Sequence, residues 1–229
     1  MVRCMKRTKL RDRVLPGYSK GEEIANTVTH IAGGIFGIVA LVLAVVSAAG
    51  KQDPYKIVGT AVYGSSMVCL YSVSSTYHGL RPGMGKKALQ VIDHCTIYFL
   101  IGGTYTPIVL GPLREMDAAL GWTVFGLVWG VSAVAAVFTA IDHEKYKRLS
   151  MLCYILAGWI IAFAAVPTIR AISLEGFLIL LGGGVAYSIG AVLYAVGKKR
   201  KTPYVHSVFH VFVLCGTALQ FVTVYCFCI

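Results

Sequence analysis

Long runs of apolar residues alternate with short polar segments along the whole chain. Seven of these runs are each about as long as the ~20 residues that a helix needs to cross ~30 Å of hydrocarbon. A helix satisfies its backbone hydrogen bonds within one segment, so continuous apolar runs favour spanning helices over barrel strands of alternating polarity. The predicted spans are residues 24–49, 57–80, 88–110, 118–141, 149–169, 174–196 and 203–229. The pattern predicts an all-α, polytopic membrane protein, a bundle of seven transmembrane helices.

The segment before the first apolar run is polar and basic. We predict that residues 1–23 form a cytoplasmic tail and that residues 24–229 form the transmembrane domain. The first run is too long for the hydrophobic core of a cleavable signal peptide, and the acidic pair Glu22 and Glu23 comes directly before it. We therefore expect this run to be a permanent membrane anchor.

The basic residues fall unevenly between the two sides that these spans define. Charged residues make up 14% of the chain, against about 25% in soluble domains, and the formal net charge is +11. Four of the 21 Lys and Arg residues fall on one side, and the other 17 fall in the tail and in the segments around residues 81–87, 145–148 and 198–201. The positive-inside rule then predicts a multi-pass protein of the cell membrane with a cytoplasmic N-terminus and an extracytoplasmic C-terminus. Because this distribution explains the positive charge, we expect no nucleic-acid partner.

Several predicted spans contain ionisable side chains, which are costly in hydrocarbon and commonly mark function. At ~1.5 Å per residue, His78 lies about 5 Å from Arg81 in the adjoining loop, and Asp93 lies about 9 Å beyond Lys87. The same measure places the other members at overlapping depths in the predicted cytoplasmic half. The full set is His30, His78, Asp93, His94, His206 and His210.

Three of these histidines have the arrangement of a metal site. His206 and His210 are four residues apart and so lie on one helical face, as metal ligands on a helix commonly do. With His78 at the same depth, three imidazoles and an open position would match a catalytic zinc site. Interhelical hydrogen bonding without a metal is the alternative. Another divalent ion also remains open, because imidazole suits several metals.

Two further polar residues predict what such a site could do. Asp93 and Ser74, one helical turn before His78, are placed to hydrogen-bond a water at the metal. A metal lowers the pKa of a nearby water, and a carboxylate can accept its proton. For His30 and His94 we expect contact with the ligands, or simple packing, in preference to ligation.

Four motifs make the chain resemble the hemolysin III family, the bacterial branch of the progestin and adiponectin receptor (PAQR) superfamily. They are Glu23-x-x-Asn26-x-x-Thr29-His30, Ser74-x-x-x-His78, Asp93-His94 followed by Gly103-Thr104-Tyr105-Thr106-Pro107, and His206-x-x-x-His210. They occur in the family's order, and the resemblance covers nearly the whole chain.

The resemblance implies a seven-helix bundle with zinc near the cytoplasmic side. It assigns the metal to His78, His206 and His210, with Ser74 and Asp93 beside it. Around these ligands we expect Asn26, His30 and His94. Relatives in the wider superfamily include ceramide-cleaving enzymes, which suggests hydrolysis of a lipid amide.

Three functions remain open on the sequence. The first is a zinc-dependent intramembrane hydrolase of a lipid, with a ceramide-like amide as one substrate. The second is a cytolytic pore-former, as the family name implies. The third is a receptor or membrane-homeostasis sensor with structural zinc. In each case a membrane lipid is the expected partner as substrate or ligand.

Small residues four apart recur in three spans and would let helices approach closely. The pairs are Gly33/Gly37, Gly126/Gly130 and Ala186/Gly190. We expect them to pack within the bundle more than between copies of the chain, and homo-oligomer formation stays open.

Overall fold

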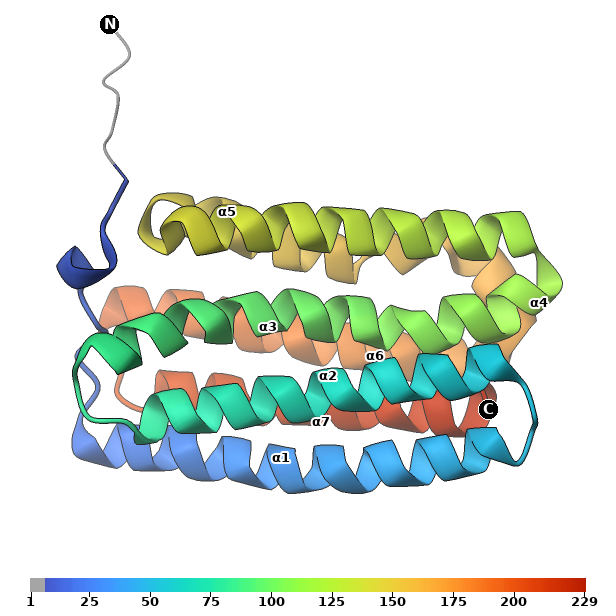
Figure 1. Ribbon diagram of the computed structural model, residues 1–229, viewed down its shortest axis with the longest axis horizontal. Helices are drawn as coiled ribbons and strands as arrows, with labels where there is room; N and C mark the ends of the chain where they lie inside the picture. Colours follow the sequence, from blue (N-terminus) through green and yellow to red (C-terminus); the bar gives the residue numbers. More distant parts are fainter. Residues whose placement is uncertain (1–6) are drawn as a thin grey trace, which may run out of the picture.

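A computed structural model describes residues 7–229 and shows an elongated bundle of long helices lying side by side (Figure 1). Residues 1–6, and with them the start of the predicted tail, lie outside the described residues. The described chain contains no β-strand. The elements are η1 (Leu10–Asp12), α1 (Lys20–Ala49), α2 (Pro54–Gly79), α3 (Met84–Ile108), η2 (Val109–Leu113), α4 (Arg114–Met116), α5 (Ala118–Gly158), η3 (Ile160–Ala164), α6 (Ala165–Arg200) and α7 (Val205–Phe227).

The structure contradicts the prediction of seven separate spanning helices. Within residues 7–229, five helical stretches are long and apolar enough to cross a bilayer. Residues 118–200, predicted as three spans with loops between them, form one helical stretch of 83 residues. Its backbone leaves helical geometry inside α5 at Asp142 and inside α6 at Ser173. The prediction placed loops of several residues where charged residues cluster, whereas the backbone leaves helical geometry there only around single residues, Asp142 and Ser173, and helix lies on both sides of each break.

The surface of α1 shows why the all-helical membrane prediction holds. Its buried positions are small or polar and recur every three or four residues, from Asn26 and His30 through Gly33 and Gly37 to Ala48. Its exposed positions are large and apolar, including Ile35 at 62% and Val46 at 67% exposure. A water-soluble helix has the reverse pattern, so this face is suited to lipid.

The two ends of the bundle are chemically different. One end carries the N-terminal segment and the turn between α2 and α3, and we call it the site end. Helix α1 begins there at Lys20, inside the stretch predicted as tail, because Ser19 and Glu22 form a capping box. At the opposite end, Lys56 Nζ at the start of α2 lies 3.4 Å from the carbonyl of Ile229. The start of α1 and the C-terminus therefore lie at opposite ends of the bundle (Figure 1).

A hydrogen-bond network around Thr217 sets the position of α2 relative to α7. The hydroxyl of Tyr71 on α2 donates to Thr217 Oγ1 over 2.8 Å, and that of Tyr63 donates to the Thr217 carbonyl over 3.2 Å. Tyr187 of α6 lies 2.9 Å from the same Oγ1. All four residues are inside the bundle, where satisfied polar networks specify one arrangement. These bonds align the two helices that carry His78, His206 and His210.

The small-residue pairs divide into two groups. A Cβ at Gly33 would meet the Tyr71 ring, one at Gly37 would lie 3.3 Å from the Val68 backbone nitrogen, and one at Gly190 would meet Phe212. These glycines pack within the bundle, as predicted. Gly126 and Gly130 have nothing within 4 Å of such a Cβ and face outward from α5. For this pair the expected packing within the chain is absent.

Close packing at the start of α5 leads to a first prediction. A Cβ at Gly121 would lie 2.6 Å from the Val109 carbonyl oxygen and 2.9 Å from Arg114 Cα, both backbone atoms. Gly121→Ala should therefore lower the free energy of unfolding by about 1–3 kcal/mol, the usual cost of overpacking. Gly126→Ala, on the same helix, is the matched control and should unfold no earlier than wild type. Thermal unfolding in detergent measures both, and equal midpoints for the two variants would contradict the packing described here.

Candidate metal centre

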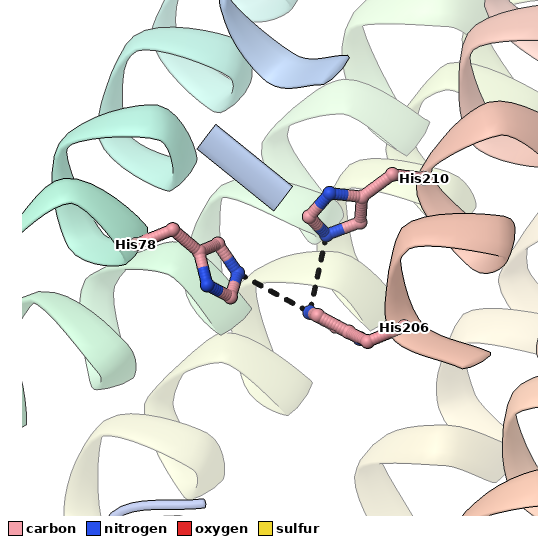
Figure 2. A group of neighbouring side chains, drawn as sticks. All are labelled: His78, His206 and His210. Atoms are coloured by element: carbon pink, nitrogen blue, oxygen red, sulfur yellow. Dashed lines mark hydrogen bonds between the residues drawn. The ribbon is translucent and has the colours of Figure 1, made fainter. Parts of the chain in front are cut away.

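Three imidazoles converge inside the site end of the bundle (Figure 2). His78 comes from the last turn of α2, and His206 and His210 come from the first two turns of α7. The Nε2 atom of His206 lies 3.2 Å from Nε2 of His78 and 3.1 Å from Nε2 of His210. His78 and His210 are each 2% exposed. One potential ligand atom from each ring lies within 4.8 Å of the others, so the group could hold a metal ion.

The orientation of His78 is set from α1. Its Nδ1 lies 2.7 Å from Glu23 Oε2 and 3.4 Å from Asn26 Nδ2. An ionised carboxylate only accepts hydrogen bonds, so the closer contact requires a proton on Nδ1. The Nε2 lone pair of a neutral His78 then faces the other two rings. The Asn26 amide is itself held by the Ser207 hydroxyl, which donates to its Oδ1 over 2.6 Å.

The orientation of His210 is also set by α1. Its Nδ1 lies 3.2 Å from Thr29 Oγ1, whose proton is already directed to the carbonyls of Ala25 and Asn26 at 2.9 and 3.0 Å. The hydroxyl oxygen is therefore the acceptor, and Nδ1 of His210 carries the proton. The ring of His30 stacks on His210 with centroids 3.5 Å apart. His30 thus supports a neighbouring ring without directing a nitrogen at the group's centre.

The third ring, His206, is enclosed by aromatic side chains. Tyr18, just before α1, stacks on it with centroids 5.2 Å apart at 13°, and Tyr194 of α6 lies 5.0 Å away. Burial raises the pKa of Tyr18 well above its ordinary value, with Tyr194 as a second cause. Nδ1 of His206 is buried and has no hydrogen-bond partner. The N-terminal segment therefore covers this side of the group.

The donor set fits a zinc ion. Ligand atoms ~2.0–2.1 Å from a tetrahedral zinc lie roughly 3.3–3.4 Å from one another, close to the observed 3.1 and 3.2 Å. With Nδ1 of His78 and His210 protonated, two Nε2 lone pairs point at His206 Nε2, which has at most one proton to offer. A cation at the centre would satisfy all three nitrogens. Hydrogen bonding alone leaves at least one interaction weak, which counts against the metal-free alternative.

Asp93 and Ser74 face one another near the last turns of α2. Ser74 is 2% exposed, and its hydroxyl interacts with the Asp93 carboxylate, whose side chain is 14% exposed. His78 lies one turn beyond Ser74 on α2, and Asp93 comes from α3. Asp93 of α3 therefore lies beside Ser74, one helical turn from His78 on α2.

His94 packs against residues other than the three converging histidines. Its Nδ1 donates to the Gln90 carbonyl over 2.7 Å, and its ring lies 4.0 Å from the ring of His143 on α5. These contacts direct it toward α5 rather than toward the ligands. Asn26 and His30, in contrast, contact His78 and His210 directly.

Three contacts of the site were not assigned from the sequence: those of Glu23, Thr29 and Tyr18. Glu23 and Thr29 carry a usable signal, because they lie three residues to either side of Asn26 and so share a helical face with it. Tyr18 carries none, since a tyrosine in a basic segment is common and only the path of the chain brings it to His206.

Comparisons with known proteins agree with the resemblance found in the motifs. The model of the family described as "Haemolysin-III related" matches residues 18–221. "Hemolysin-3" of Bacillus cereus is 37% identical over 200 residues, covering 87% of this chain and 89% of that protein. The "Hemolysin-3 homolog" of Bacillus subtilis (strain 168) is 37% identical over 208 residues, covering 91% and 95%.

A more distant relative connects the chain to the wider superfamily. The human "Monocyte to macrophage differentiation factor" is 24% identical over 183 residues, covering 76% of this chain and 72% of that protein. No solved structure matches the chain significantly.

Proposed function

The chain belongs to the haemolysin-III related family within the PAQR superfamily, and from this premise we propose that it is a zinc-dependent intramembrane hydrolase of a lipid amide. The observation that supports the proposal most strongly is the convergence of three Nε2 atoms beside a carboxylate. Three neutral imidazoles with an open fourth position are typical of catalytic zinc sites, whereas structural zinc sites fill all four positions with protein ligands. Lipid is the natural substrate because the described outer surface is apolar.

In this proposal each polar residue has a separate task. His78, His206 and His210 hold the metal, which when bound supplies a Lewis acid and lowers the pKa of water beside it. Asp93 accepts a proton from the attacking water and returns it to the departing amine, as a general base and then a general acid. Ser74 donates a hydrogen bond to Asp93 and keeps its carboxylate directed at the reacting atoms.

The proposed orientation places this chemistry at the cytoplasmic side. The site end carries the basic N-terminal segment and Lys198–Lys201, which the positive-inside rule assigns to the cytoplasm. A substrate head group would then meet the three histidines from the cytoplasmic side, and its acyl chain would remain in the bilayer.

Metal removal tests the proposal. Protein purified in detergent without added metal should contain about one zinc per chain and should release fatty acid from a fluorescent short-chain ceramide. Stripping the zinc with a chelator should stop hydrolysis, and adding zinc back should restore it. The proposal fails if wild-type protein retains no metal, or if fully loaded protein hydrolyses no ceramide or other amide-linked lipid.

The same preparation separates the two alternative functions. The names of the two Bacillus relatives refer to haemolysis, so leakage from dye-loaded liposomes should be measured with loaded and stripped protein. Leakage that is independent of zinc would favour a pore-former. A fall in thermal stability on stripping, with no hydrolysis by the loaded protein, would instead favour a sensor with structural zinc.

A further inference from the structure

A buried lysine holds the carboxylate that orients His78. The amine of Lys86, in the first turn of α3, lies 2.6 Å from Glu23 Oε1, while Glu23 Oε2 lies 2.7 Å from His78 Nδ1. Each carboxylate oxygen therefore has one partner, and the chain of contacts runs from α3 through α1 to α2. Lys86 was predicted to be one of the loop residues that set membrane orientation, but it is 3% exposed and lies inside the bundle.

The contacts of Lys86 use its full hydrogen-bonding capacity. An ammonium group has three donors, and besides Glu23 the Lys86 amine donates to the carbonyls of His78 and Leu80 over 3.2 and 3.0 Å. Two of its three acceptors are therefore the His78 carbonyl and Glu23, whose carboxylate contacts the His78 ring. The same cation fixes the backbone of His78 and the carboxylate that fixes its ring.

The charges point to a role beyond packing. A buried ammonium is costly unless it is paired, and Glu23 supplies the pairing charge. With Lys86 beside it, Glu23 accepts a hydrogen bond from Nδ1–H of His78, which leaves Nε2 as the lone-pair donor toward His206 and His210. Carboxylate partners of this kind orient metal-binding histidines and increase their basicity.

We propose that Lys86 and Glu23 are positioning residues for the metal centre, and that their ion pair sets the ring orientation and tautomer of His78. This inference rests on the proposed metal-dependent function, since it assigns these two residues to the same site. It assigns neither of them contact with the metal or the substrate.

Zinc affinity of the purified, folded protein tests the proposal, with two matched pairs of variants. Lys86→Met should weaken zinc binding about 10- to 100-fold, the usual effect of losing an outer partner of a ligand. Lys87→Met is its control, because the Lys87 amine contacts the backbone carbonyl of Arg11 instead. Glu23→Gln should weaken binding similarly, while Glu22→Gln should not, because Glu22 caps α1 and contacts the Tyr204 backbone.

A double variant shows whether weaker zinc binding results only from loss of folding. Glu23→Gln alone leaves a buried lysine unpaired and could unfold the bundle, whereas Glu23→Gln/Lys86→Met removes both charges. Cobalt substituted for zinc should show an altered visible spectrum in Lys86→Met and the double variant but not in Lys87→Met, because the ligand geometry changes.

Two results would overturn the inference. One is a zinc affinity within twofold of wild type for both Lys86→Met and the double variant. The other is a lower unfolding temperature with unchanged affinity and cobalt spectrum, which assigns the pair a structural role only. If wild-type protein binds zinc but hydrolyses no lipid amide, the proposed hydrolase fails while the affinity test still decides the role of Lys86.

Discussion

His206→Ala should reduce the zinc content of the purified protein from about one per chain to near zero and should abolish lipid hydrolysis. Nε2 of His206 is the atom that both other rings face, at 3.2 and 3.1 Å. Its removal leaves His78 and His210 with nothing between them, and two ligands hold zinc far more weakly than three. We expect the affinity to fall by more than ~100-fold, beyond the loss usually caused by removing an outer partner. Metal analysis and a chelator competition assay measure the change.

His94→Ala is the control for this experiment. It removes a histidine from the same end of the bundle, but one whose ring contacts Gln90 and His143 rather than the three converging rings. It should retain zinc at wild-type stoichiometry. Equal zinc content in His206→Ala and wild type would show that the histidines form an interhelical hydrogen-bonding group and not a metal site.

Asp93→Asn should give a protein that still holds zinc but hydrolyses lipid far more slowly. Asparagine has nearly the same shape and can still interact with Ser74, yet it cannot accept a proton at neutral pH. Loss of a general base typically costs ~10²- to 10⁴-fold in rate, so hydrolysis should fall by that factor. Zinc content and thermal stability should stay close to wild type, because Asp93 is not among the three converging ligands.

An exposed carboxylate provides the comparison for Asp93. Asp12 in the N-terminal segment is 60% exposed at its side chain, and Asp12→Asn should leave the rate unchanged. Full hydrolytic activity in Asp93→Asn would remove Asp93 from the reaction. A loss of zinc in the same variant would instead assign Asp93 to metal binding.

His206→Ala and Asp93→Asn together distinguish metal binding from proton transfer. His206→Ala tests whether the convergence seen in Figure 2 is a metal site at all. Asp93→Asn tests whether that site does chemistry. A structural zinc predicts loss of stability in the first variant and no phenotype in the second, so the pair also distinguishes the hydrolase from the sensor.

The sequence predicted the convergence of His78, His206 and His210 because the evidence for it is local. His206 and His210 are on one helical face by spacing alone, and the depth argument placed His78 level with them without any tertiary information. The family resemblance agreed independently, and the family assignment is confirmed. For residues 118–200 the prediction of three spans separated by loops was wrong, because the chain forms one helical stretch that is interrupted only by breaks at Asp142 and Ser173.

The partners of the ligands could not be predicted in this way. Lys86 was assigned to a loop because it lies between the apolar runs at residues 57–80 and 88–110, yet its amine turns inward onto Glu23. His94 was expected either to contact the metal-binding histidines or simply to pack. Because adjacent residues on a helix point about 100° apart, His94 faces α5 while Asp93 faces Ser74. The direction of a long flexible side chain, or of one of two adjacent side chains on a helix, depends on the residues of other helices that it packs against.

What the sequence determined by itself is the all-helical membrane character of the chain and the face and depth of the three converging histidines. These follow from apolar run length and from helical periodicity, which are properties of one segment at a time. Only the tertiary structure decided which nitrogen of each ring points inward, which side chains hold the rings, and how the helices between α3 and α7 are divided. Those features depend on contacts between segments far apart in the chain, such as Glu23 with His78 and Lys86, and no periodicity within one helix encodes them.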